Sequence, residues 1–303
     1  MIEREICGVL PVNKPAGMTS HDVVFKIRKL YGTKKVGHTG TLDPLATGVL
    51  PVLIGRGAKA AEYLLSENKG YKAEIKLGIT TDTEDITGKI LTKSDTLPTK
   101  EEFFEAVNHF IGEIEQVPPM YSALKVDGKK LVDLAREGIV IERQARKITI
   151  YSIKAECINE KEGIYTLDVD CSKGTYIRTL CADIGAYLGC GAVMSELNRT
   201  KSGNFVLDYA HTIAQIEEMS MEERLSLVKP VEELFLEAPE VILPDFFAKL
   251  CRSGCQIYQK KIKTSYDIGT FIRICDKDGF FALGQVNDYD DGTAIKAIKL
   301  FKL

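Results

Sequence analysis

The spacing of apolar residues along the chain predicts at least two short helices. From Ser20, which is expected to cap the first helix, apolar residues recur every three or four positions to Leu30, and Gly32 follows as a stop signal. Further along, Thr99 and Glu102 have the spacing of a capping box, which predicts the start of a second amphipathic helix. Each helix should bury one face.

Other segments alternate with the period of a strand. Apolar and charged residues alternate from Tyr71 to Leu77, and similar alternations run through 147–153 and 165–171. A period of two predicts half-buried antiparallel strands. Because strand-like and helix-like segments are mixed and no internal repeat is visible, we expect an α+β fold.

A chain of 303 residues is long enough for a large domain and a small one. We expect the large domain over 1–240, with an acidic helix that ends near Leu236. A small, mostly β domain is expected over 244–303, where β-like runs at 271–275 and 280–286 flank Asp278-Gly279.

Composition narrows the class of protein. The chain is 45% apolar and 27% charged, which is ordinary for a folded protein. The longest apolar run, 48–54, is far below the 20 or so residues that span a bilayer and contains Pro51, and residues 1–5 do not resemble a secretory signal. We therefore expect a cytoplasmic protein that is not in a membrane.

The eight cysteines are scattered without a disulfide framework, which favours reduced thiols. The one close pair, Cys251 and Cys255, has no histidine near it in sequence, so no metal site is expected there.

Charge is segregated along the chain although the net charge is only −3. Residues 14–59 carry eight basic side chains against two acidic ones, and 215–240 carry eight glutamates against two basic residues. Residues 120–147, with seven basic and four acidic residues and an Asp127-Gly128 turn signal, should form an exposed basic excursion. Such segregation permits a phosphate-binding face, although solvated helix faces give the same pattern.

The candidate chemistry concentrates in 35–52, where glycine, proline and threonine predict a rigid loop around Asp43. A carboxylate placed in this way can be a nucleophile, a general base or a metal ligand. It can also simply cap a turn before Pro44. Nearby lysines and His38 favour its ionised form.

Residues 37–48, GHTGTLDPLATG, resemble the signature of bacterial TruB-type tRNA pseudouridine-55 synthases. Further segments resemble the motifs of that family in the same order along the chain, and the resemblance is distinct from about Gly8 to Gly203. These segments are 10–20, 69–71, 81–88, 118–125, 174–180 and 197–200.

The resemblance implies a pseudouridine synthase fold, in which a central and mostly antiparallel sheet is followed by a small β-rich, PUA-like C-terminal domain that binds RNA. It implies that uridine-55 of the tRNA T-loop is flipped out and isomerised, with no cofactor and no metal. Asp43 would attack C6 of uracil or C1′ of the ribose, or act as a base in a glycal route. The tRNA T-arm and loop would be the partner of a monomer that needs no other protein.

The resemblance also implies five substrate-binding residues. Arg178 would pair with Asp43, and Tyr71 would stack on the base and is a candidate for moving a proton. The other three, which would line the pocket or hold the flipped nucleotide, are His38, Tyr176 and Leu197. Asn13 and Lys14 would brace the catalytic loop rather than touch the substrate.

Three other functions compete with this one. Guide-RNA-dependent synthases share the aspartate loop, although segments 81–88 and 120–147 favour a stand-alone enzyme. An RNA-binding or RNA-folding factor would not need the combination of Asp43, Tyr71 and Arg178. A metal-dependent hydrolase would need Asp43, Asp82 and Asp85 to converge on an ion.

Overall fold

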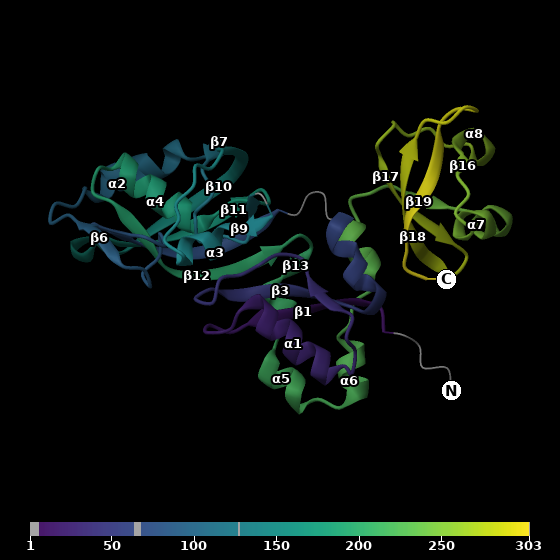
Figure 1. Ribbon diagram of the computed structural model, residues 1–303, viewed down its shortest axis with the longest axis horizontal. Helices are drawn as coiled ribbons and strands as arrows, with labels where there is room; N and C mark the ends of the chain where they lie inside the picture. The colour runs from purple at the N-terminus through teal and green to yellow at the C-terminus, as the bar shows by residue number, and fades with distance from the viewer. Residues whose placement is uncertain (1–5, 64–67, 127, 303) are drawn as a thin grey trace.

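A computed structural model describes residues 6–63, 68–126 and 128–302 (Figure 1). The charged N-terminal segment 1–5 and Asp127 of the predicted turn lie outside the described residues. Two β-sheet units follow one another along the chain, the first large and the second small.

The large unit is built on a ten-stranded sheet in the order β14-β1-β3-β12-β4-β11-β10-β7, with β2 paired to β3 and β13 to β12. Its strands are β1 (Gly8–Lys14), β2 (Val36–His38), β3 (Thr47–Ile54), β4 (Lys69–Leu77), β7 (Gly112–Gln116), β10 (Arg146–Asn159), β11 (Ile164–Cys171), β12 (Ala192–Ser202), β13 (Phe205–Val206) and β14 (His211–Thr212). Only the β1–β14 and β3–β12 pairs of this sheet are parallel. The predicted mostly antiparallel sheet is confirmed, and the alternating segments form β4, β10 and β11.

Helices cover this sheet. They are α1 (Ser20–Leu30), α2 (Lys100–His109) and α4 (Ile177–Tyr187), with the 3-10 helices η1 (Gly55–Tyr63), η2 (Glu160–Glu162) and η3 (Leu207–Tyr209). The capping box of α2 at Thr99 and Glu102 is confirmed. For α1 the predicted cap was wrong by one residue, because Thr19 caps the helix with Asp22, and the Ser20 side chain bonds to the loop at Leu42 instead.

The core of the large unit lies between the sheet and these helices. It contains Val23 and Ile27 of α1 and Ile75 of β4. Where α2 crosses the far strands, the rings of Phe103 and Tyr165 stack with centroids 3.8 Å apart. Burial of these apolar faces is the main force that fixes the helices on the sheet.

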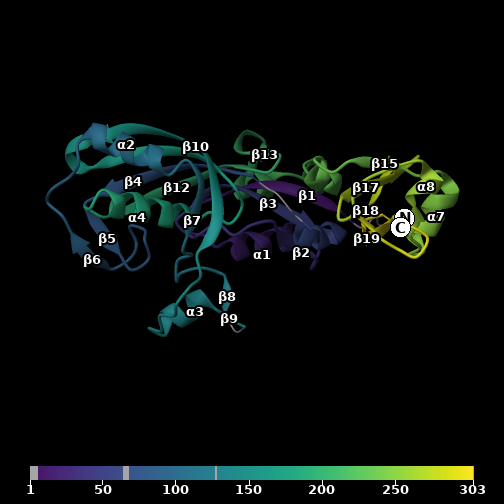
Figure 2. The ribbon, with the colours of Figure 1, turned by 90° about the horizontal axis from the view of Figure 1, so that it is seen from above.

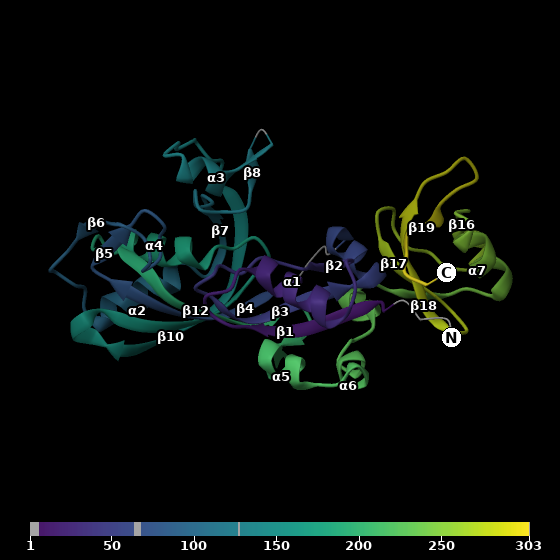
Figure 3. The ribbon, with the colours of Figure 1, turned by 60° about the horizontal axis from the view of Figure 1, so that its bottom comes forward.

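Residues 120–126 and 128–145, which precede β10, form a small projection with its own apolar cluster around Met120, Leu131 and Leu134. It contains β8 (Lys125–Val126), β9 (Lys129–Lys130) and α3 (Leu131–Arg136). Figures 2 and 3 show α3 and β8 standing away from the main sheet. The predicted exposed basic excursion is thus a compact element that we call the insertion.

The predicted acidic helix ending near Leu236 was wrong. The segment instead forms α5 (Ile213–Glu218), α6 (Met221–Ser226) and η4 (Val231–Phe235). Thr212 and Ser220 each begin a new helix with a capping box, and Pro230 precedes η4, so these residues divide the segment into three helices.

The small unit is a five-stranded sheet in the order β15-β17-β18-β19-β16. Its elements are β15 (Glu240–Ile242), α7 (Asp245–Arg252), β16 (Ile257–Tyr258), α8 (Gln259–Ile262), β17 (Phe271–Asp276), β18 (Gly279–Asn287) and β19 (Ala294–Leu300). A two-stranded sheet of β5 (Ile79–Thr81) and β6 (Ile90–Lys93) lies at the other end of the molecule (Figure 1).

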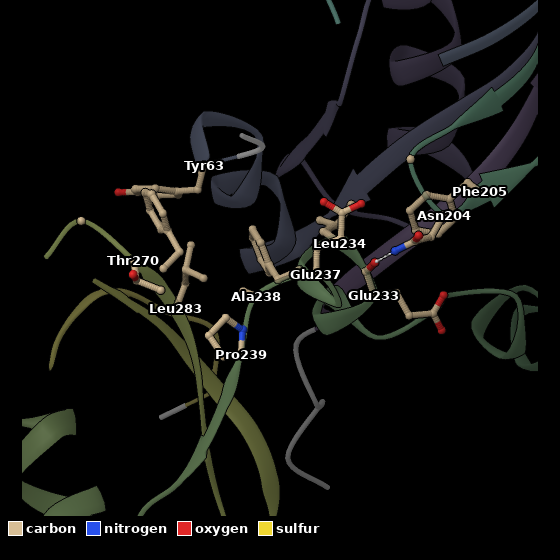
Figure 4. Close-up of a pocket in the computed structure, with 14 residues that line it drawn as sticks. Tyr63, Asn204, Phe205, Glu233, Leu234, Glu237, Ala238, Pro239, Thr270 and Leu283 are labelled. Carbon is tan, nitrogen blue, oxygen red and sulfur yellow. Dashed lines mark hydrogen bonds between the residues drawn. The ribbon is translucent and has the colours of Figure 1, made fainter. Parts of the chain in front are cut away.

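The two units share an apolar cluster. Val49 and Leu53 of β3 belong to the same cluster as Leu283 of β18, and the ring of Phe235 lies between the units, 6.3 Å from that of Phe280. A cavity of about 430 Å³ remains at this junction, between Tyr63, Leu234 and Leu283 (Figure 4). Among the described residues every helix is too short or too polar to span a bilayer. The eight cysteines are all free thiols.

We predict that Gly48→Ala destabilises the protein more than Gly189→Ala does. Both glycines have a positive φ, which costs about 1–2 kcal/mol for another residue. At Gly48 a β-carbon would also overlap the backbone of Arg199, whereas Gly189 faces open space. Urea unfolding of the two variants measures the difference, and equal losses of unfolding free energy would contradict the close approach of β3 and β12.

Candidate active site

A cavity of about 550 Å³ opens where the Asp43 loop, β4, β12, the insertion and the start of α4 meet. Its lining brings together Asp43, Tyr71, Tyr176, Arg178 and Leu197, which are distant in sequence. His38 lies on β2, opposite Val52 of β3, and is not among the lining residues. The lining contains one carboxylate, Asp43, and five basic side chains: Lys69, Lys130, Lys173, Arg178 and Arg199. This balance suits a polyanionic ligand.

Asp43 and Arg178 form an ion pair at this cavity. Nε of Arg178 lies 2.9 Å from Oδ2 of Asp43, and the arginine side chain is 6% exposed against 34% for the aspartate. The carboxylate therefore reaches solvent and incoming ligand, while the cation behind it is shielded. A guanidinium stays protonated in such surroundings, so it holds a positive charge against the carboxylate.

The other two guanidinium nitrogens of Arg178 are also occupied. Nη1 donates to the backbone carbonyl of Thr83 at 3.0 Å, and Nη2 donates to that of Tyr121 at 2.8 Å. The first carbonyl belongs to the turn between β5 and β6 and the second to the insertion. Two carbonyls therefore hold Arg178 in one orientation, in addition to its ion pair with Asp43.

The side chains of Ser20 and Lys14 support the backbone of the loop around Asp43. The Ser20 hydroxyl donates to the Leu42 carbonyl and accepts from the Leu42 amide. Lys14, which is fully buried, donates to the carbonyls of Pro15, Met18 and Pro44 at 2.9, 2.6 and 3.4 Å. Burial lowers the pKa of Lys14 to about 8, and the charge of Asp43 acts in the opposite direction. The bracing role predicted for Lys14 matches these contacts.

Two tyrosines face the cavity from different elements. Tyr71 lies on β4, and burial raises the pKa of its phenol, an effect that the nearby Arg199 charge opposes. Tyr176 is the residue before α4, and burial raises its pKa as well. The backbone of Tyr176 is fixed on both sides by the Gln116 amide, at 2.8 and 3.1 Å. The site therefore contains two protonated phenols at neutral pH.

Leu197 and His38 both lie on strands of the large sheet, β12 and β2. Leu197 is 9% exposed, and its carbonyl accepts from the Thr47 hydroxyl at 3.3 Å. Burial lowers the pKa of His38, which favours the neutral ring, and its Nδ1 is buried without a hydrogen-bond partner. His38 can therefore support the loop as a neutral side chain.

Sequence reasoning missed Arg199 as a residue of the site. Its guanidinium donates to the carbonyls of Val49 at 2.8 Å and Gly40 at 3.2 Å, next to the Asp43 loop. A signal was available, because Leu197 and Arg199 are two positions apart on β12 and so share one face of the strand. The backbone contacts of Gln116 gave no such signal, because they join residues 60 positions apart.

The carboxylates required by a metal-dependent hydrolase do not gather around Asp43. Asp85 accepts from the hydroxyls of Thr83 and Thr87, and Asp82 accepts from the amide of Lys89. Among the described residues, the group of possible ligands that does come together is Glu232, Glu240 and Cys275. Arg273 bonds to both of those glutamates, at 2.7 and 3.3 Å.

The junction cavity of Figure 4 does not suit the same chemistry. The charged side chains among its lining residues are Glu233 and Glu237, and no basic residue lines it. A polyanion would be repelled there. The cavity that contains Asp43 is therefore the candidate active site.

Comparison with known proteins agrees with the fold and the cavity. Residues 28–177 match the TruB family pseudouridylate synthase N-terminal domain, and residues 178–236 match the tRNA pseudouridylate synthase B C-terminal domain. The chain is 46% identical over 298 residues to tRNA pseudouridine synthase B of Alkaliphilus oremlandii, covering 98% of each protein. It is 43% identical over 279 residues to that of Clostridium tetani, covering 92% of this chain and 95% of the relative.

Solved structures show the same architecture. A Cbf5-Nop10-Gar1 complex contains a chain with a TM-score of 0.75 and 28% identity, matched over 97% of this chain and 84% of the other. An H/ACA RNP bound to a substrate RNA gives a TM-score of 0.73 and 26% identity, over 98% and 85%. The fold is that of the pseudouridine synthases, with a PUA-like C-terminal unit. Within that class, the chain belongs to the TruB family, as the sequence motifs predicted.

We predict that Lys14→Met lowers the free energy of unfolding by about 2 kcal/mol, because it leaves buried carbonyls without their donor. The matched control is Lys26→Met, which removes only a half-exposed ion pair with Glu217 and should cost less than about 1 kcal/mol. Urea unfolding measures both variants. A Lys14→Met protein as stable as Lys26→Met would show that the lysine does not brace the loop.

Proposed function

We propose that the protein isomerises uridine-55 in the T-loop of tRNA to pseudouridine. The observation that carries the proposal is the Asp43–Arg178 pair, with a partly exposed carboxylate and a shielded cation, in a cavity otherwise lined by basic and aromatic residues. In the reaction N1 of uracil loses its bond to C1′ and gains a proton, while C5 loses a proton and bonds to C1′. The exchange is internal to the nucleotide, so it requires no redox or group-carrying cofactor.

Asp43 is the catalytic residue in this proposal. As a carboxylate it attacks C6 or C1′, or removes a ribose proton in a glycal route, and in each route the ion pair with Arg178 holds the carboxylate in place. The target uridine must leave the T-loop stack before either carbon can reach Asp43. Because the carboxylate is partly exposed and Arg178 is not, a flipped base can enter without breaking the ion pair.

The remaining residues bind the flipped nucleotide. Tyr71 offers a ring face for stacking and a hydroxyl that, once ionised, can take up the C5 proton. Tyr176 and Leu197 close the pocket around the base. His38 supports the loop from β2 and helps to hold the nucleotide.

The basic side chains around the cavity would bind phosphates of the T-arm. Lys130 of the insertion lines the cavity, which supports a direct role of this element in RNA binding. We propose that the protein acts as a monomer in the cytoplasm and requires no other protein.

We also propose a catalytic domain over 1–240 and an RNA-binding domain over 244–303. The strand β15, at 240–242, pairs with β17 and lies at the boundary between them.

We predict that wild-type protein releases tritium from tRNA labelled at uracil C5, in EDTA, and that Asp43→Asn does not. The mutant amide cannot act as a nucleophile or base, although it should bind tRNA. The matched control is Asp95→Asn, an exposed carboxylate far along the chain, which should keep full activity. Tritium release by Asp43→Asn would refute nucleophilic aspartate chemistry. If neither protein releases tritium while both bind tRNA, an RNA-binding or guide-dependent function takes its place.

Arg178→Lys should reduce the single-turnover rate by about 100-fold or more, because an ammonium cannot reach Asp43 and both carbonyls in the planar geometry of a guanidinium. Affinity for tRNA should change little, since Arg178 is buried behind Asp43. Rate and affinity are measured on the same preparations. Loss of affinity with an unchanged rate would instead assign Arg178 to RNA binding.

A further inference from the structure

Arg199 and Tyr71 lie directly opposite each other on paired strands. They are register partners in the antiparallel β4–β12 pair, and both line the cavity that contains Asp43. Side chains at such positions are in contact range on one face of the sheet. The positive charge of Arg199 therefore acts on the phenol of Tyr71.

Arg199 is the largest side chain in the described core and is 1% exposed. Its Nε and Nη2 are held by the carbonyls of Val49 and Gly40. None of the ion pairs between described residues involves it, so no carboxylate cancels its charge at short range. A buried cation with this environment is costly to maintain, which suggests that the charge itself has a use.

The positive charge of Arg199 can stabilise a negative charge on the neighbouring phenol of Tyr71. A buried phenol resists losing its proton, because the phenolate is poorly solvated. Burial raises the pKa of Tyr71, and Arg199 is the largest effect that lowers it.

We propose that Arg199 is a positioning residue that acts through Tyr71, stabilising the phenolate that must form before Tyr71 can take the proton from C5. This inference rests on the proposed function. In the step, the C5–H bond breaks and its electron pair re-forms the C5–C6 double bond. The Tyr71 phenol first gives its proton to solvent, and the phenolate so formed takes the C5 proton. N1, which has lost the ribose, takes up a proton from solvent.

The test is a titration of Tyr71 by NMR in protein with ¹³C-labelled tyrosine Cζ, the resonance being assigned with Tyr71→Phe. Arg199→Gln should move the Tyr71 midpoint to higher pH and lower the single-turnover rate at neutral pH about tenfold or more, with tRNA affinity unchanged within about twofold. Ser20→Ala is the matched control, because it loosens the same loop at Leu42 without changing any charge. It should leave the Tyr71 midpoint unchanged.

Arg199→Lys keeps the charge but loses the planar arrangement of donors. The proposal expects a Tyr71 midpoint and a rate near those of wild type. If Arg199→Gln does not fold, the midpoint and the rate of Arg199→Lys test the proposal in its place. An unchanged midpoint with a rate at least about 100-fold lower would show that Arg199 serves only to clamp the loop. A wild-type Tyr71 that stays protonated until the protein unfolds, or a midpoint unaffected by Arg199→Gln, would also overturn the proposal.

The NMR result does not depend on the reaction. If wild-type protein fails to release tritium, the proposed function fails, while the titration still reports whether Arg199 and Tyr71 are coupled. If tritium is released and the titration shows no coupling, only the role of Arg199 is lost.

Discussion

The guanidinium of Arg178 joins three parts of the protein that fold from distant segments. Its three nitrogens bond the carboxylate of Asp43, the carbonyl of Thr83 and the carbonyl of Tyr121, which belong to the active-site loop, the turn after β5 and the insertion. A buried guanidinium that lost one of these acceptors would lose much of its stabilisation. The position of each segment therefore depends on the other two, and the RNA-facing insertion is tied physically to the ion pair at the centre of the site.

Several cations lie around Asp43. Arg178 binds it directly, while Lys14 and Arg199 are buried around its loop and satisfied by backbone carbonyls rather than by carboxylates. Carbonyl dipoles solvate these charges without neutralising them, so the site keeps a positive potential. That potential favours a phosphate-bearing ligand and negative charge on a neighbouring phenol. One set of backbone contacts thus supports loop rigidity, RNA binding and the proposed proton transfer.

The same architecture occurs in this chain and in chains of two solved complexes, a Cbf5-Nop10-Gar1 complex and an H/ACA RNP, although identity falls to 28% or below. Fold similarity alone would leave stand-alone and guide-dependent function open. The identity of 43–46% over nearly the whole length of bacterial relatives places the chain with TruB. The insertion forms part of the wall of the active-site cavity, because its residues Tyr121 and Lys130 line that cavity.

The sequence by itself determined β4, β10, β11, β17, β18, the α2 cap and the family motifs, because each depends on residues within a few positions of one another. The loop predicted over 35–52 is shorter than expected, because β2 and β3 extend into it. The sequence also placed Asp43, Tyr71, Tyr176, Arg178 and Leu197 as candidates, which the cavity brings together. It misplaced the α1 cap and merged α5, α6 and η4 into one helix, since adjacent hydroxyls compete for the same cap and an acidic run looks continuous. Only the tertiary structure decided the contacts of Arg199 and Gln116. Those contacts join side chains to backbone groups 60 to 159 positions away, a distance at which local patterns carry no information.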